Sequence, residues 1–231
     1  MIDVPSKKSS LVRAFATESG RKTDDVDAYS VALAAWHSPN LERVTPDDET
    51  ETFRLLAHRR KELVALRTQA VTRLHRELLI LLPGGAKRRL RAAAAKQLLA
   101  SVRPRDAVGK LRKQLALDQL ADLVAIDKRI AEINRQINVA VKATDTTLTD
   151  VYGVGPVVTA MVLGEVRNIA RFRTADHFAS YNATAPSLWG SGGDATPCVN
   201  LHGNRQLNSA MHIAALSQMR HPGPGRDYYL R

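Results

Sequence analysis

The spacing of apolar residues predicts a mainly helical chain built around two long helices. Between about 48 and 82, Leu56, Leu63 and Ala70 recur every seven residues. Between about 105 and 142, the spacings alternate between three and four, which is typical of a coiled-coil seam. That seam consists of Leu123, Ile126, Ile130, Ile133 and Ile137. We expect a long antiparallel, coiled-coil-like helical hairpin over 47–143, although an ordinary helical bundle core fits the spacing equally.

Shorter elements are expected on either side of this hairpin. A helix is predicted over Asp24–Trp36 with Thr23 as its N-cap, whereas residues 1 to about 22 show no clear period. A short basic helix is expected over 86–101, between the glycines that end the first long helix and a following proline. A compact helical C-terminal domain is expected over 147–231.

The positive charge is concentrated in one block of the chain. The whole sequence has a net charge of +11, and residues 57–113 contain 16 Lys and Arg but only three acidic residues. The block includes Lys87, Arg88, Arg89 and Arg91. Charge this one-sided repels itself without an anionic surface opposite, which favours a nucleic-acid-binding surface over a merely solvated helix face.

The remaining composition excludes several classes of protein. Apolar residues make up 44% of the chain, which excludes a wholly disordered protein. A single cysteine, Cys198, excludes a disulfide framework and a Cys-rich zinc site. The longest aliphatic run, 78–82, is far shorter than the roughly 20 residues of a membrane-spanning helix. No secretory signal is visible, so we expect a cytoplasmic protein with no membrane partner.

Two carboxylates are the first candidate for chemistry. Asp24 and Asp27 are three residues apart on a predicted helix and therefore share a face. Such a pair can contribute oxygen ligands to a hard divalent cation, although a complete site needs further carboxylates. An acidic first turn that complements the helix dipole is the alternative.

A glycine-rich turn is the second candidate. In Gly153-Val154-Gly155-Pro156 the proline suits the first position of a helix, and the pattern is that of a helix-hairpin-helix. Gly153 and Gly155 would let the backbone approach a nucleic-acid phosphate. A packing joint without a ligand is the alternative.

The third candidate is a serine among glycines. Ser191 lies in Gly190-Ser191-Gly192-Gly193, where its hydroxyl could reach a substrate or could belong to a flexible linker. Further on, Asn204 is a suitable N-cap, and Arg205 beside it could bind a phosphate or be an ordinary surface residue.

Taken in order, these segments resemble the transposases of insertion sequences 110, 116 and 902. The resemblance rests on Lys22-Thr23-Asp24 with Asp27, the Gly-Val-Gly-Pro turn, Ser191 before Gly-Gly, and Gly203-Asn204-Arg205. It implies an RNase H-like N-terminal domain whose acidic quartet binds Mg²⁺, with Asp24 and Asp27 as its last two members. It also implies that Ser191 forms a covalent phosphoserine with DNA, and that the long helices mediate homo-oligomerisation. A structured guide RNA is a further implied partner.

The sequence departs from this family pattern at its N-terminal end. The first two carboxylates of the quartet have no counterpart before Asp24, so we expect residues 1–46 to be the remnant of an N-terminally truncated catalytic domain with a weak Mg²⁺ site. The expected function is DNA transposition and recombination by phosphoryl transfer. The alternative is a catalytically inactive nucleic-acid-binding remnant or subunit.

Overall fold

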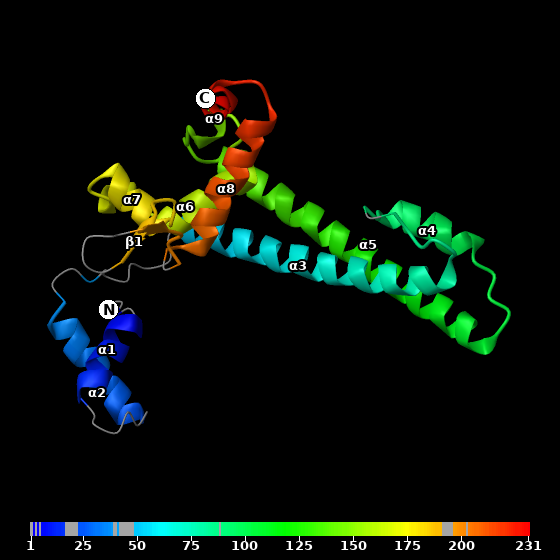
Figure 1. Ribbon diagram of the computed structural model, residues 1–231, viewed down its shortest axis with the longest axis horizontal. Coiled ribbons are helices and arrows are strands. Elements are labelled where there is room, and N and C mark those ends of the chain that lie inside the picture. The colour runs from blue at the N-terminus through cyan, green and yellow to red at the C-terminus, as the bar shows by residue number, and fades with distance from the viewer. Residues whose placement is uncertain are drawn as a thin grey trace. The chain divides into compact units, whose positions relative to one another are not determined.

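The computed structural model describes residues 2, 4, 6–16, 23–38, 41, 49–87, 89–190, 196–201 and 203–231. The chain divides into two compact units, 1–48 and 49–231, which are described one at a time. Both are built mainly of helices (Figure 1), which confirms the predicted fold class at that level. Within the described residues, no helix is long and apolar enough to cross a membrane.

The first unit contains helices α1 (Ser6–Ala16) and α2 (Asp24–Trp36). The bounds of α2 and its Thr23 cap are as predicted, with the Thr23 hydroxyl accepting a hydrogen bond from the Val26 amide at 3.4 Å. The sequence did not predict α1, because its first turns are polar and carry no apolar period. The RNase H-like character expected for this region is not confirmed by two helices and stays a prediction.

Two long antiparallel helices dominate the second unit. Helices α3 (Glu49–Leu81) and α5 (Ala107–Lys142) lie side by side along most of their length (Figure 1). Polar contacts cross between them in antiparallel register: Arg60 Nε donates to Asn134 Oδ1 at 2.7 Å, and Arg67 Nε donates to Asp127 Oδ1 at 2.5 Å. The predicted helical hairpin is therefore present.

Helix α4 (Ala92–Ser101) packs on the hairpin and closes its apolar core. The predicted basic helix was placed too early, because it begins at Ala92 and not at 86. Gly84 and Gly85 adopt positive φ and end α3, and the buried Leu90 anchors the non-helical segment that follows. The core combines buried residues of all three helices with Leu90: Ala70, Leu74, Leu78, Ala95, Leu99, Ala116, Leu120 and Leu123.

Several shorter elements follow α5. A two-stranded antiparallel hairpin pairs Ser187 with Cys198 and Trp189 with Thr196. Helices α6 and α8 share a second apolar core that includes Val158, Val162 and Leu207. The elements are η1 (Leu148–Asp150), α6 (Pro156–Val166), η2 (Ile169–Arg171), α7 (Ala175–Tyr181), β1 (Ser187–Trp189), β2 (Thr196–Cys198), α8 (Arg205–Arg220) and α9 (Pro224–Leu230).

Helix α6 joins this C-terminal region to the hairpin. Ala160 on α6 is buried in a third core with Phe53 on α3 and Ile137 on α5. The helices approach so closely that a Cβ atom at Gly164 would lie 2.6 Å from the backbone nitrogen of Arg54. The C-terminal elements are thereby anchored directly on α3 and α5.

Candidate nucleic-acid site

The two candidate metal ligands lie in the first turn of α2 but differ in their surroundings. Asp24 is exposed, whereas the Asp27 carboxylate forms an ion pair with Arg13 of α1. No group of three or more His, Cys, Asp or Glu within the described part of the chain could hold a metal ion. Two carboxylates, one of them already paired with a guanidinium, do not complete a Mg²⁺ site.

The glycine turn leads into α6 as predicted, with Pro156 as the first helical residue. The element before the turn is only a three-residue 3₁₀ helix, so a helix-hairpin-helix is not confirmed. Gly153 has a φ of 84°, and a Cβ atom there would lie 2.9 Å from the carbonyl oxygen of Ala214. Gly153 therefore serves close packing on α8, whereas nothing lies within 4 Å of a Cβ at Gly155.

Two of the predicted site residues, Ser191 and Arg88, lie outside the described residues. The described strands on either side of Ser191 are β1, which ends two residues before it, and β2, which begins at Thr196. Cys198 Sγ donates to the carbonyl oxygen of Ser187 at 3.2 Å, which adds a side-chain contact to this strand pair. In sequence, Ser191 lies between these two strands.

Asn204 caps α8 as predicted, because its Oδ1 atom accepts hydrogen bonds from the amides of Gln206 at 3.0 Å and Leu207 at 2.9 Å. Arg205 is the exposed first residue of the helix. Its exposure is compatible with either of the roles considered for it, a phosphate contact or an ordinary surface position.

The other predicted cations lie on the segment between α3 and α4. Lys87, Arg89 and Arg91 are exposed, and no ion pair joins them to another described residue. Ion pairs elsewhere on the hairpin neutralise part of the positive block, as at Glu77, whose carboxylate accepts from Arg112 at 3.2 Å. These three cations therefore face solvent near the end of the hairpin remote from α6 (Figure 1).

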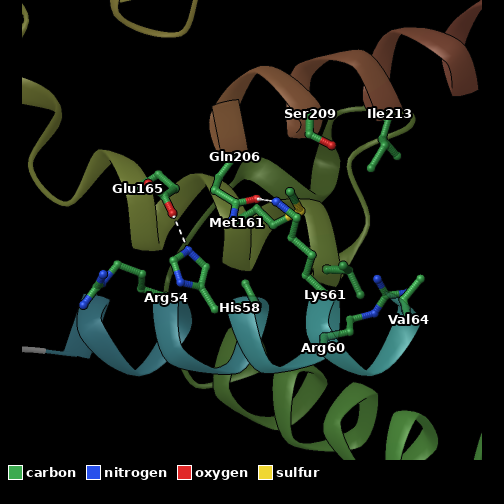
Figure 2. A pocket seen from close by; sticks show the side chains of 12 residues that line it. Arg54, His58, Arg60, Lys61, Val64, Met161, Glu165, Gln206, Ser209 and Ile213 are labelled. Carbon is green, nitrogen blue, oxygen red and sulfur yellow. Dashed lines mark hydrogen bonds and ion pairs between the residues drawn. The ribbon is translucent and has the colours of Figure 1, made fainter. Parts of the chain in front are cut away.

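A groove that none of the sequence motifs indicates lies between α3, α6 and α8. It encloses about 200 Å³, and Figure 2 shows His58 and Lys61 of α3 facing Glu165 of α6 and Gln206 of α8. His58 Nε2 lies 2.9 Å from Glu165 Oε1, and Lys61 Nζ donates to Gln206 Oε1 at 2.9 Å. Glu165 is the one charged residue in α6. A single carboxylate in an otherwise apolar helix is the sequence feature that could have indicated this groove.

The fold is thus that of a basic, mainly helical protein in which a long hairpin carries a helical C-terminal region. A family model described as "Transposase IS116/IS110/IS902 family" matches residues 145–230, and a second transposase model, of the DEDD IS110 type, matches residues 3–83. The chain belongs to this transposase family.

Two curated insertion-element proteins are similar to this chain. An IS116 44.8 kDa protein of Streptomyces clavuligerus is 30% identical over 128 residues, which is 53% of this chain and 31% of that protein. An IS110 43.6 kDa protein of Streptomyces coelicolor is 34% identical over 117 residues, which is 48% of this chain and 28% of that protein. The chain spans about a third of the length of these relatives.

Proposed function

We propose that this chain acts in DNA transposition as an insertion-sequence recombinase whose nucleophile is Ser191. The observation that carries the proposal is the agreement of two family models at separate parts of the chain, one of which includes Ser191 and the other Asp24 and Asp27. The order of the motifs along the sequence supports the same assignment.

The proposed chemistry is phosphodiester exchange. The Ser191 hydroxyl gives up its proton and attacks phosphorus, so that a serine O–P bond forms while a P–O bond to deoxyribose breaks. One phosphodiester replaces another, and the reverse attack by a deoxyribose hydroxyl rejoins DNA and releases the serine. Because one phosphodiester P–O bond forms for each one that breaks, the exchange needs no external energy source.

The proposed partner is nucleic acid. The exposed cations Lys87, Arg89 and Arg91 would neutralise backbone phosphates, and Arg205 and Gly155 would add contacts nearer to Ser191 in sequence. A structured guide RNA is the second proposed nucleic acid. The α3–α5 hairpin, which has exposed apolar residues such as Val108 and Leu111, is the proposed surface for homo-oligomerisation.

Mg²⁺ is the proposed cofactor, with Asp24 and Asp27 as two of its ligands. When bound, the metal would neutralise charge that develops on the reacting phosphate. Further ligands would have to come from outside the described residues, and Asp27 would have to exchange Arg13 for the cation.

Strand transfer by Ser191→Ala tests the proposal. The substrate is DNA that carries the ends of the insertion sequence, supplied with RNA transcribed from those ends. Loss of strand transfer with unchanged DNA affinity is expected, because the substitution removes one hydroxyl and no charge. Ser187→Ala, four residues earlier on β1, is the matched control and should remain active. Equal activity of the Ser191→Ala variant and the parent chain would contradict the proposal.

A second candidate function is nucleic-acid binding without catalysis. The Arg13–Asp27 ion pair favours it, because a carboxylate held by a guanidinium is a poorer metal ligand. If this second function is correct, the parent chain binds DNA but gives no strand transfer, whether metal, RNA or both are added. It also alters the activity of a full-length relative when the two are mixed.

A further inference from the structure

We propose that the groove between α3, α6 and α8 binds one unpaired base of single-stranded DNA, with Lys61 on the adjoining backbone phosphate. The inference rests on the proposed function for its choice of DNA, because exchange of strands unstacks the bases beside the phosphodiester that is exchanged. None of the residues that line the groove is assigned a part in the exchange itself.

The inner surface of the groove is largely apolar. The half-buried Met161 of α6 lies between Val64 of α3 and Ile213 of α8 in the set of lining side chains (Figure 2). Val64 is 38% exposed and Ile213 is 42% exposed, so both present apolar surface to solvent. A thioether and two aliphatic side chains provide a surface against which the flat face of a ring can pack.

The size of the groove restricts the ligand. The groove encloses about 200 Å³. Pockets for drug-sized ligands enclose roughly 300–1,000 Å³, so this groove suits a single ring system. A nucleobase is such a group, and its sugar and phosphate would remain outside, where the charged side chains lie.

Polar groups at the rim retain hydrogen-bonding capacity. Gln206 Oε1 accepts from Lys61 Nζ at 2.9 Å, which leaves the Gln206 NH₂ group without a partner among the described residues. The exposed Ser209 hydroxyl, one turn further along α8, also faces the groove (Figure 2). An amide and a hydroxyl can pair with the polar edge of a base, whereas an aliphatic side chain from a protein partner would bury them unpaired. The rim therefore favours a base over an apolar side chain.

The charge of Lys61 is available to a phosphate. Lys61 is exposed, and its hydrogen-bond partner Gln206 is a neutral amide. Among the described residues that line the groove, Glu165 carries the one carboxylate. That carboxylate is only 12% exposed and already contacts His58 Nε2 at 2.9 Å and Asn204 Nδ2 at 2.6 Å. The groove thus combines an apolar surface with a cation that no carboxylate neutralises.

Binding of two fluorescein-labelled DNA strands to the full chain tests the proposal. The strands have the same number of phosphates, but one carries bases throughout and the other has abasic sites over its central part. The parent chain should bind the strand with bases about tenfold more tightly. This is the gain expected from burying roughly 60 Å² of apolar surface.

Ser209→Leu fills the groove without changing its charge. The substitution should remove the preference for the strand with bases. It should leave the slope of log affinity against log salt unchanged, because the phosphate contacts remain. Thr68→Leu adds similar apolar bulk at an exposed position of α3 outside the groove, so this matched control should keep the preference.

Lys61→Gln separates the phosphate contact from the base contact. It should lower the salt slope by about 0.7, which is the contribution of one phosphate of a single strand. Lys128→Gln removes an exposed cation of α5 outside the groove and should leave the slope unchanged. Because Lys61→Gln adds no bulk at an exposed position, it tests the proposal even if circular dichroism shows that Ser209→Leu is misfolded.

Three results would overturn the inference: equal affinity of the parent chain for the two strands, a preference that persists in folded Ser209→Leu or is lost equally in Thr68→Leu, and an unchanged slope in Lys61→Gln. Tighter binding of an RNA strand with the same dependence on Ser209 would also overturn it, because the ligand would then be RNA. Absence of strand transfer in the parent chain would instead contradict the proposed function, and the binding data would still decide whether the groove takes a base.

Discussion

Glu51, in the first turn of α3, is a nearly buried carboxylate held by two guanidinium groups. Arg54 Nε donates to its Oε2 atom at 2.9 Å, and Arg167 Nη2 reaches the same oxygen at 2.8 Å. Hydrogen bonds from Arg54 and the charges of both arginines lower the pKa of Glu51, against the opposing effect of burial. Arg167 follows α6 with a φ of 55°, which is uncommon for a residue with a side chain.

This ion-pair group predicts that folding stability depends on acid pH. Because the pKa of Glu51 is lower in the folded chain than its ordinary 4.5, the stabilisation is present above pH 4.5 and is lost as pH falls below that value. Thermal unfolding followed from pH 7 to pH 3 should show the melting temperature of Glu51→Gln falling less steeply than that of the parent chain. Parallel curves would exclude a contribution from Glu51.

At the scale of elements, α6 depends on a close approach to α3 that only glycine permits. A Cβ atom at Gly164 would lie 2.6 Å from the nitrogen and 2.7 Å from the Cα of Arg54. These are backbone atoms of a long helix and cannot move aside as a flexible side chain could. The small size of residue 164 therefore sets how near the C-terminal region lies to the hairpin.

Gly164→Ala should accordingly destabilise the chain although alanine is the better helix former. Overpacking of a close contact costs about 1–3 kcal/mol, which exceeds the roughly 1 kcal/mol that alanine gains in helix propensity. Urea unfolding measures the difference, and Gly155→Ala, where nothing lies within 4 Å, serves as the comparison. Equal stability of Gly164→Ala and the parent chain would show that the helices separate readily.

The packing of the hairpin core predicts that two leucines of α5 differ in how much they contribute to the free energy of unfolding. Leu123 is 0% exposed, whereas Leu111 is 61% exposed. Leu123→Ala should lower the free energy of unfolding by about 2–5 kcal/mol through loss of buried surface and the resulting cavity. Leu111→Ala should leave that free energy nearly unchanged in dilute solution, and urea titrations of the two variants would test the contrast.

The sequence predicted the long helices α3 and α5 well, because their apolar patterns extend over many residues. The seven-residue repeat and the seam through Leu123 and Ile137 indicated α3 and α5, and local capping rules placed Thr23 and Asn204 correctly. What could not be predicted depends on packing between distant segments. The Arg13–Asp27 pair, the contact of Gly153 with α8 and the Glu165–Asn204 pair join residues whose proximity no local pattern reveals.

At the scale of the whole molecule, the dominant property is the uneven distribution of charge. Residues 57–113 carry a net charge of +13, which exceeds the +11 of the whole chain, and most of the cations in this block are exposed. Among the residues that the structure describes, Lys87, Arg89 and Arg91 are exposed cations of this block with no ion pair, at the end of the hairpin remote from α6. The charge distribution thus favours a polyanionic partner at that end of the hairpin.

Salt dependence of DNA binding tests this distribution. Neutralising Lys87, Arg89 and Arg91 to glutamine should reduce the slope of log affinity against log salt by about 2.7, because each phosphate contact contributes about 0.9. The matched control neutralises three exposed cations of α5 outside the block: Lys128, Arg129 and Lys142. The same loss in both triple variants would mean that binding responds only to net charge.

The assignment of Ser191 as the nucleophile is tested most directly by mapping the covalent bond between protein and DNA. End-labelled DNA is incubated with the chain and the RNA transcript, the mixture is denatured, and the DNA-linked peptide is identified by mass spectrometry. We predict a covalent adduct at Ser191 that is lost in Ser191→Ala and kept in Ser187→Ala. An adduct at another residue, or strand transfer without any adduct, would contradict it.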